Sequence, residues 1–391
     1  MTNEPTRALE AREAALGLSW LCAGGIHSLL RLLARWGPVA IWRAPRRRLL
    51  EWGIDPSTAA RFETRRREFA LDEAEAMLLR GGIAFLPYGS AGYPRELMQL
   101  ELPPAGLFAR GSDSALSRLL SVSRITIVGT RKATTYGLRA AEIFATAFVG
   151  KGVAVVSGMA SGIDGRAHQA TLDAGGLTVG ILGCGVDVAY PSRHRGLYEK
   201  IRQSGVILSE LPPGTPPARW TFPRRNRLLA ALGDALLVVE GSPRSGALQT
   251  AGWSLDLGRP VFAVPGPISI ESHRGCNQLL YEGAGPAVDP CVTVEDFFLQ
   301  TRINTCEYGR AGGGEDATPI VVGQMGLFDR GAPKQPRLDS ILTALGDGPC
   351  SVDRLIDSTG LSARQLNVAL GELEIAGLVA RAGPGQFIRA P

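Results

Sequence analysis

The stretch from Arg124 to His168 constrains the fold more than any other part of the sequence. It holds two apolar runs, 125–129 and 153–157, each followed by a turn rich in Gly, Ser or Thr and then by a helical pattern. A strand, a helix and a parallel strand make a βαβ unit, whose strands end at the same edge of a sheet. Free N–H groups at a helix N-terminus favour an anion. The stretch therefore predicts an anion pocket at two neighbouring strand ends.

The same alternation continues to residue 264. Short apolar runs, typical of strands covered on both faces, are separated by helical stretches. The predicted strands are 125–129, 153–157, 178–182, 206–210, 235–240 and 261–264, and the predicted helices are 137–149, 164–173, 193–203, 225–232 and 247–257. This order predicts an α/β fold with a doubly wound, mainly parallel sheet. Residues 89–111 are Pro-rich and show few strand or helix signals.

The flanking regions predict smaller domains. Residues 1–80 have apolar residues at helical spacing, whereas 301–337 contain Gly and Pro typical of a linker. From Leu338 to the end, three helical patterns and a hairpin predict a helix-turn-helix with a wing. This last segment has four arginines and six acidic residues, a net charge of −2, which suits a DNA backbone poorly. The predicted domains are 1–80, 81–300, a linker at 301–337, and 338–391.

Composition adds a mild preference for an anionic partner. The net charge is +5, and only four of the 42 basic residues are lysine. Arginine binds phosphate in a bidentate manner, but nucleotide bias in the coding genome explains the excess equally well. The arginines between 43 and 67 fit either a nucleic-acid contact or a solvated helical face. The six cysteines form no Cys-x-x-Cys pair, and no signal-peptide core or membrane-spanning run is present. We expect a cytoplasmic protein without a metal.

Several short motifs are weak candidates for catalysis. Asp164 and His168 lie four residues apart on one predicted helix, where a helix N-cap with an i,i+4 partner is the better interpretation than an acid–base pair. The run from Gly183 to Gly185 lacks the third glycine of a dinucleotide fingerprint. Cys184, between them, is expected to be a buried small residue. No P-loop and no nucleophile elbow occurs in the sequence.

The run Phe222-Pro-Arg-Arg-Asn-Arg227 is more specific. It places three arginines at the start of an apolar helix, so at least one should face the crevice at the strand ends. Together with Arg131 it predicts a positive pocket without a catalytic acid or base. Such a pocket binds phosphate and does no evident chemistry on it.

The order of these motifs resembles the DprA/Smf family of DNA-processing proteins. The resemblance is dense from about residue 85 to 290, extends more loosely to the first 80 residues, and rests on motifs that follow one another in register. They are Val128-Gly-Thr-Arg131, Tyr136-Gly137, Ser157-Gly-Met-Ala-Ser-Gly-Ile-Asp164, Ala167-His168, Leu182-Gly-Cys-Gly-Val-Asp187, Tyr190-Pro191, Ser209-Glu210, Phe222-Pro-Arg-Arg-Asn-Arg227, Ser245-Gly-Ala-Leu248 and Val264-Pro-Gly266.

The resemblance implies an extended Rossmann-like domain, an N-terminal helical domain similar to a sterile alpha motif (SAM-like), and a C-terminal winged helix. It also implies a homodimer that binds single-stranded DNA without a cofactor, protects incoming strands in natural transformation, and loads the RecA recombinase. The DNA-binding residues it implies are Gly129, Thr130, Arg131, Lys132, Ser157, Gly158, Arg166, Arg224, Arg225, Asn226 and Arg227. Many relatives have Lys or Arg before the Gly-Ile-Asp motif, where this chain has Ser161. Lys132 or Arg166 is a candidate substitute.

Two other functions compete with this hypothesis. One is a nucleotide-hydrolysing enzyme of the lysine-decarboxylase-like Rossmann group, but the turn from Ser245 to Thr250 is not followed by the Glu that this chemistry needs. The other is a transcription regulator that reads duplex DNA through its winged helix. The net charge of −2 in that domain argues against it.

Overall fold

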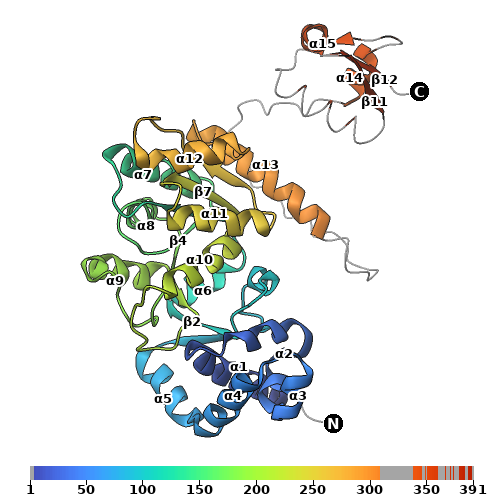
Figure 1. Cartoon of the computed structure of the whole chain (residues 1–391). Helices are drawn as coiled ribbons and strands as arrows, with labels where there is room; N and C mark the ends of the chain where they lie inside the picture. Colours follow the sequence, from blue (N-terminus) through green and yellow to red (C-terminus); the bar gives the residue numbers. More distant parts are fainter. Residues whose placement is uncertain are drawn as a thin grey trace. The chain divides into compact units, whose positions relative to one another are not determined.

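A single nine-stranded sheet organises the first 300 residues of the computed structural model (Figure 1). The structure describes residues 4–308 and, in the C-terminal part, 338–345, 348, 350–359, 366, 370, 373, 378–383 and 386–389. The chain divides into two compact units, residues 1–313 and 314–391.

The sheet has the strand order β1-β2-β6-β5-β4-β3-β7-β8-β9. Its strands are β1 (Ala84–Pro87), β2 (Gly106–Gly111), β3 (Arg124–Gly129), β4 (Ala154–Ser157), β5 (Thr178–Ile181), β6 (Val206–Ser209), β7 (Ala235–Glu240), β8 (Val261–Ala263) and β9 (Gly285–Pro286). From β6 to β9 all neighbours are parallel, whereas β1–β2 and β2–β6 are antiparallel. The predicted doubly wound α/β fold is therefore confirmed, and its order reverses between β3 and β7.

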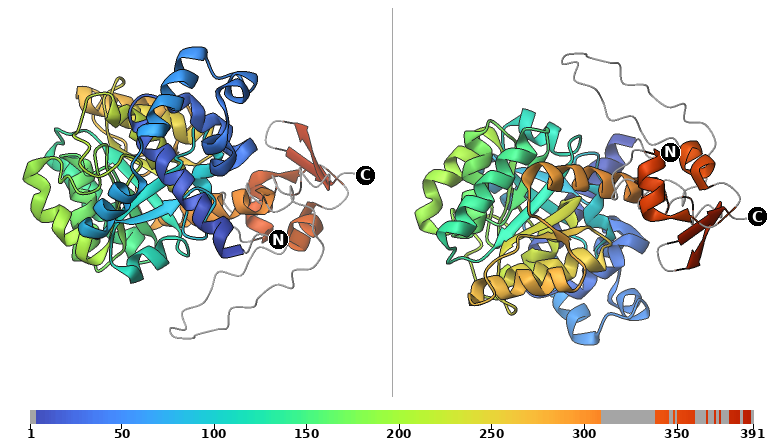
Figure 2. Two further views of the ribbon diagram at one scale, coloured as in Figure 1. Left: turned by 90° about the horizontal axis from the view of Figure 1, so that it is seen from below. Right: turned by 90° about the horizontal axis from the view of Figure 1, so that it is seen from above.

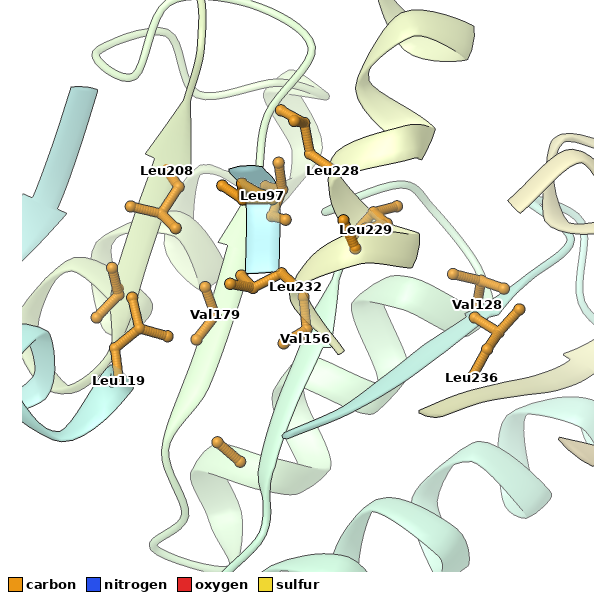
Figure 3. Packing of buried hydrophobic residues seen from close by; sticks show 14 of the residues in the cluster. Leu97, Leu119, Val128, Val156, Val179, Leu208, Leu228, Leu229, Leu232 and Leu236 are labelled. Carbon is orange, nitrogen blue, oxygen red and sulfur yellow. The ribbon is translucent and has the colours of Figure 1, made fainter. Parts of the chain in front are cut away.

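Helices cover both faces of this sheet (Figure 2). In this α/β part they are η2 (Arg95–Gln99), α6 (Asp113–Leu119), α7 (Thr135–Val149), α8 (Ile163–Asp173), η3 (Ser192–His194), α9 (Arg195–Ser204), α10 (Thr221–Leu232), α11 (Gly246–Asp256), α12 (Glu271–Tyr281) and α13 (Pro290–Tyr308). Because side chains alternate along a strand, β3 sends Val128 to one core and Ile127 to the other. Leu228, Leu229 and Leu232 of α10 pack in the first of these cores (Figure 3).

Two sequence expectations differ from the structure. Residues 89–111 contain η2 and the strand β2, which joins β1 to β6 at the antiparallel edge. This strand was missed because its run, Gly106–Gly111, is bounded by prolines and glycines that obscure the pattern. In addition, α13 continues to Tyr308, so the predicted linker begins within a helix. Residues 309–337 lie outside the described residues.

The predicted N-terminal helices are present and have a core of their own. They are α1 (Glu4–Ala23), η1 (His27–Leu32), α2 (Leu33–Arg43), α3 (Arg46–Glu51), α4 (Pro56–Glu68) and α5 (Leu71–Gly81). A second cluster joins them to the sheet, because Leu16 and Leu78 pack with Phe85 and Phe108. The helices therefore belong to the same compact unit as the sheet, and a domain boundary at residue 80 stays a prediction.

The second unit contains the described part of the predicted winged helix. It has α14 (Leu338–Leu345), β10 (Cys350–Ser351), α15 (Val352–Thr359), β11 (Val379–Gly383) and β12 (Gln386–Arg389), with strand order β10-β12-β11. The predicted hairpin is the antiparallel pair β11–β12. Of the predicted third helix, only Leu366, Leu370 and Leu373 are among the described residues, and all three are buried.

Candidate nucleic-acid interface

Three adjoining hollows lie beyond the carboxyl ends of the parallel strands, and Arg131 lines all of them. The first, of about 600 Å³, lies where the strand order reverses, between the ends of β3 and β7. The others measure about 280 and 540 Å³. The three together are called the strand-end groove below. Its lining includes the cations Arg131, Lys132, Arg166, Arg193, Arg219 and Arg225 and one carboxylate, Asp164.

Buried Glu240 fixes the turn that carries Arg131. At the end of β7, the main-chain carbonyl of Glu240 accepts a hydrogen bond of 2.7 Å from the N–H of Thr130. Its carboxylate accepts bonds from the N–H and hydroxyl of Thr134, at 3.0 and 2.9 Å. Thr134 in turn caps α7 through the N–H of Gly137. The loop between Thr130 and Thr134 is therefore held at both ends.

Arg131 projects from this loop over an aromatic ring. Its guanidinium carbon lies 5.1 Å from the ring centroid of Phe222 at the start of α10, a cation–π distance. The ring of Tyr190 lies 5.4 Å from the same ring. Both aromatic residues line the first two hollows. A cation and two partly exposed rings thus share one part of the groove.

The turn between β4 and α8 differs from the sequence prediction. Its N–H groups are not free, because the buried carboxylate of Asp164 accepts bonds from Gly158 and Ala160 at 3.1 and 3.4 Å and also from Gly129. Gly162, not Asp164, is the N-cap of α8. His168 bonds to Thr178 at 2.6 Å rather than to Asp164. An anion site made of free backbone N–H groups is therefore wrong here, since the protein supplies its own carboxylate.

Arg225 is the arginine of α10 that reaches the groove. It lines the first two hollows, is 5% exposed, and donates hydrogen bonds to the carbonyls of Gly158 and Ile181. Burial lowers the pKa of Arg225 to about 10, against the opposing effect of Asp164. A side chain at Gly158 would displace this guanidinium. Neighbouring Asn226 lines the first hollow and bonds to the carbonyl of Gly246 at 3.3 Å.

Some of the remaining predicted residues line the groove, and the others are part of the structure that supports it. Gly129, Thr130, Lys132 and Gly158 line the groove, as does Arg166, which forms an ion pair with Glu142 at 2.7 Å. Ser157, Arg224 and Arg227 line none of the three hollows. Ser157 is fully buried and bonds to the carbonyl of Ile127 at 2.6 Å.

Arg224 and Arg227 converge instead on buried Glu210. The Nε of Arg224 lies 3.1 Å from Oε1 of Glu210, and Arg227 pairs with the other carboxylate oxygen. Nη1 of Arg224 also lies 2.6 Å from Nδ1 of His27 in η1, one of the N-terminal helices. The sequence predicts all three arginines in one groove. The direction of a side chain in the first turn of a helix depends on what packs against that turn, which the sequence does not show.

Among the described residues, no group of three or more His, Cys, Asp or Glu side chains could hold a metal ion. Cys184 is buried as predicted, and burial raises the pKa of its thiol to about 12. In the same described part, no helix combines the length and apolarity needed to cross a bilayer.

Comparisons with known proteins agree with this architecture. A family model described as DNA recombination-mediator protein A matches residues 84–298. The chain belongs to the DprA/Smf family. A DprA winged-helix model matches residues 329–385, so the C-terminal winged helix is confirmed.

Relatives and solved structures of the DprA/Smf family cover most of the chain. A DprA protein of Mycobacterium tuberculosis is 36% identical over 374 residues, 90% of each chain, and protein Smf of Escherichia coli is 33% identical over 78% of this chain and 76% of its own. The X-ray structure of DprA from Streptococcus pneumoniae has a TM-score of 0.60 at 28% identity, covering 74% of this chain and 96% of that one. DprA from Helicobacter pylori, solved for its single-stranded DNA binding mode, has a TM-score of 0.50 at 27% identity, covering 56% and 96%.

Sequence reasoning missed four groove residues in this member of the DprA/Smf family. They are Tyr190, Arg193, Arg219 and Phe222. Tyr190 and Phe222 stood in the motifs that carried the resemblance but received no role. Arg219 lies in the connection after β6, where an arginine gives no periodic signal that would reveal its direction. Arg193 was included in the predicted helix 193–203, but it lies in the separate short helix η3 that precedes α9.

Proposed function

We propose that this chain binds single-stranded DNA in the strand-end groove and does no chemistry on it. The charge of the groove carries the proposal. Six cationic side chains line it, while its one carboxylate, Asp164, is occupied by backbone N–H groups. Such a lining attracts a polyanion, and arginine matches the geometry of a phosphate.

The aromatic residues favour a single strand over a duplex. Tyr190 is 36% exposed, and its ring lies with that of Phe222 beside Arg131. Unpaired bases stack on such rings with little sequence preference, whereas the bases of a duplex are already stacked on one another. The relative from Helicobacter pylori, solved for single-stranded DNA binding, supports the same substrate.

The predicted site residues divide into two roles under this proposal. Those that line the groove lie against the DNA, and Gly129 and Gly158 do so without free N–H groups to offer: Gly129, Thr130, Arg131, Lys132, Gly158, Arg166, Arg225 and Asn226. Ser157, Arg224 and Arg227 instead stabilise the strands and the helix α10 that position these residues. A hydrolytic role has little support at this site. Asp164 is engaged, and the raised pKa of Cys184 disfavours a thiolate nucleophile.

Membership of the DprA/Smf family supports the wider role. We propose that the chain acts in the cytoplasm as a homodimer, protects incoming single strands during DNA uptake, and loads RecA onto them. Strands coated by a single-stranded-DNA-binding protein should accept RecA filaments faster when this chain is added, as measured by RecA ATP hydrolysis. An unchanged rate would contradict loading but not DNA binding.

Binding to oligo-dT and to duplex of equal length, measured over a salt series, tests the DNA proposal. We expect tighter binding to oligo-dT and a steep fall with salt. Arg131→Ala should weaken binding by about 1–2 kcal/mol and lower the salt slope by about 0.7, the value for one phosphate contact on a single strand. Lys151→Ala is the control, because Lys151 is exposed at the opposite end of β4. Equal affinity for duplex, or an unchanged Arg131 variant, would contradict this placement.

A further inference from the structure

The guanidinium of Arg193 lies beside Ser161 on the groove, at the position where many relatives have a basic residue. It belongs to the short helix η3 between β5 and α9, and it donates a hydrogen bond to the hydroxyl of Ser161 just before α8. It lines both the 280 Å³ and the 540 Å³ hollow. We infer that Arg193 is a DNA-phosphate contact that leads the strand from Arg131 across the start of α8 into the hollow between α8 and α9. This inference rests on the proposed single-stranded-DNA function.

The charge of Arg193 is directed to the groove because its partner there is neutral. Ser161 offers a hydroxyl, which leaves the guanidinium charge unbalanced at that contact. Arg166, a predicted substitute in the same hollow, forms an ion pair with Glu142. Arg166 also lowers the pKa of the Glu142 carboxyl, as expected for a pair that neutralises part of its charge. Arg193 is therefore the better placed of the two to meet a phosphate.

The support beneath Arg193 is fixed by the next residue. Nδ1 of His194 lies 3.1 Å from the carbonyl of Met159, which joins η3 to the turn after β4. A side chain at Gly165 would collide with the His194 ring, so glycine permits the close approach of α8. Ser161 is 7% exposed and small, which lets Arg193 lie over it. A long basic side chain at position 161 would place its charge in the same part of the groove.

This shared position provides a direct test by charge replacement. Oligo-dT affinity is measured over a salt series for the whole chain carrying Arg193→Ala, then for the double variant Arg193→Ala/Ser161→Lys. The single variant should bind about threefold to tenfold more weakly, with a salt slope lower by about 0.7. The double variant should recover most of both. Arg195→Ala is the matched control, because Arg195, the first residue of α9, is an exposed arginine two positions from Arg193 that lines none of the three hollows.

The outcomes separate this inference from the proposed function. Loss in Arg193→Ala with recovery in the double variant supports it. Unchanged affinity and slope in Arg193→Ala, or an equal loss in Arg195→Ala, overturn it while leaving the groove in place. A loss that the second substitution does not restore assigns the effect to the connection itself and also overturns it. If the unmodified chain fails to bind oligo-dT, or if Arg131→Ala has no effect, the proposed function fails instead.

Discussion

At the scale of single residues, Asp164 ties the end of β3 to the turn after β4. Its carboxylate accepts N–H groups from Gly129 at the end of β3 and from the turn after β4, and Arg225 bonds to the carbonyl of Gly158 in that turn. Burial raises the pKa of Asp164, while Arg225 and the backbone donors counteract this effect. A buried charge of this kind is tolerated because its lone pairs are used. The carboxylate of Asp164 thus occupies the place at which the sequence predicts a bound anion.

Replacing Asp164 should therefore cost stability. We expect Asp164→Asn to lower the free energy of unfolding by about 2–3 kcal/mol, because the amide cannot accept as many bonds and leaves Arg225 without its nearby charge. The midpoint of urea unfolding measures this effect. Asp173→Asn, at an exposed position of the same helix, should change it by less than about 0.5 kcal/mol. Equal effects of the two substitutions would show that the carboxylate has no organising role.

At the scale of elements, the N-terminal helices are joined to α10 by a cluster of His27, Glu210, Arg224 and Arg227. Arg224 bridges Glu210 of the α/β part and His27 of η1, and the Trp220 ring lies 6.2 Å from the His27 ring. Burial, followed by the charge of Arg224, lowers the pKa of His27 to about 4. A pKa this low keeps the imidazole neutral near pH 7, so that a ring nitrogen can accept a hydrogen bond from the guanidinium. This contact connects the first 80 residues to the helix that carries Arg225.

The contact between His27 and Arg224 should make the free energy of unfolding depend on pH. Arg224, Arg227 and Glu210 are the charges that act on His27, and the folded state binds its proton less readily than the unfolded state. Stability from this group is complete above about pH 6.5 and is lost as the pH falls towards 4. Because His27 is only half-buried, we expect the loss of unfolding free energy between pH 7 and pH 5 to be about 1 kcal/mol smaller in His27→Gln. Urea unfolding at the two pH values measures it, and identical losses in both proteins would refute it.

At the scale of the whole molecule, the groove proposed to bind DNA and the winged helix belong to separate compact units. The strand-end groove lies wholly within residues 1–313, and the winged helix within 314–391. The segment from Leu338 onward has a net charge of −2. A surface of that charge gains little from the phosphates of a duplex. We therefore expect the winged helix to contact protein or to regulate rather than to read DNA.

Separating the two units tests this division of roles. Residues 1–313 should keep oligo-dT affinity within about threefold of the whole chain, because all the groove cations are retained. Residues 314–391 alone should give no footprint on duplex DNA at low salt. A clear footprint would instead favour the transcription-regulator hypothesis for this unit.

Much of the α/β architecture could be predicted from the sequence. Buried parallel strands need continuous apolar runs, and the six predicted runs correspond to β3 through β8. The strand β2 was missed because the prolines and glycines that bound its short run resemble a loop. The arginines of α10 show a second limit. The sequence shows that they are present. Only the tertiary structure shows that Arg224 and Arg227 contact Glu210 and His27, whereas Arg225 reaches the groove.

The sequence by itself determined the order of elements, the edge of the sheet at which a site would lie, and the presence of Arg131 in it. These follow from local periodicity and from the rule that parallel strands end at one edge. Only the tertiary structure decided which polar groups remain available to a ligand. Asp164 takes up the N–H of Gly129, which lies 35 positions away at the end of β3, and Arg193 reaches Ser161 across 32 positions. Such pairings depend on distances between elements, which no local pattern contains.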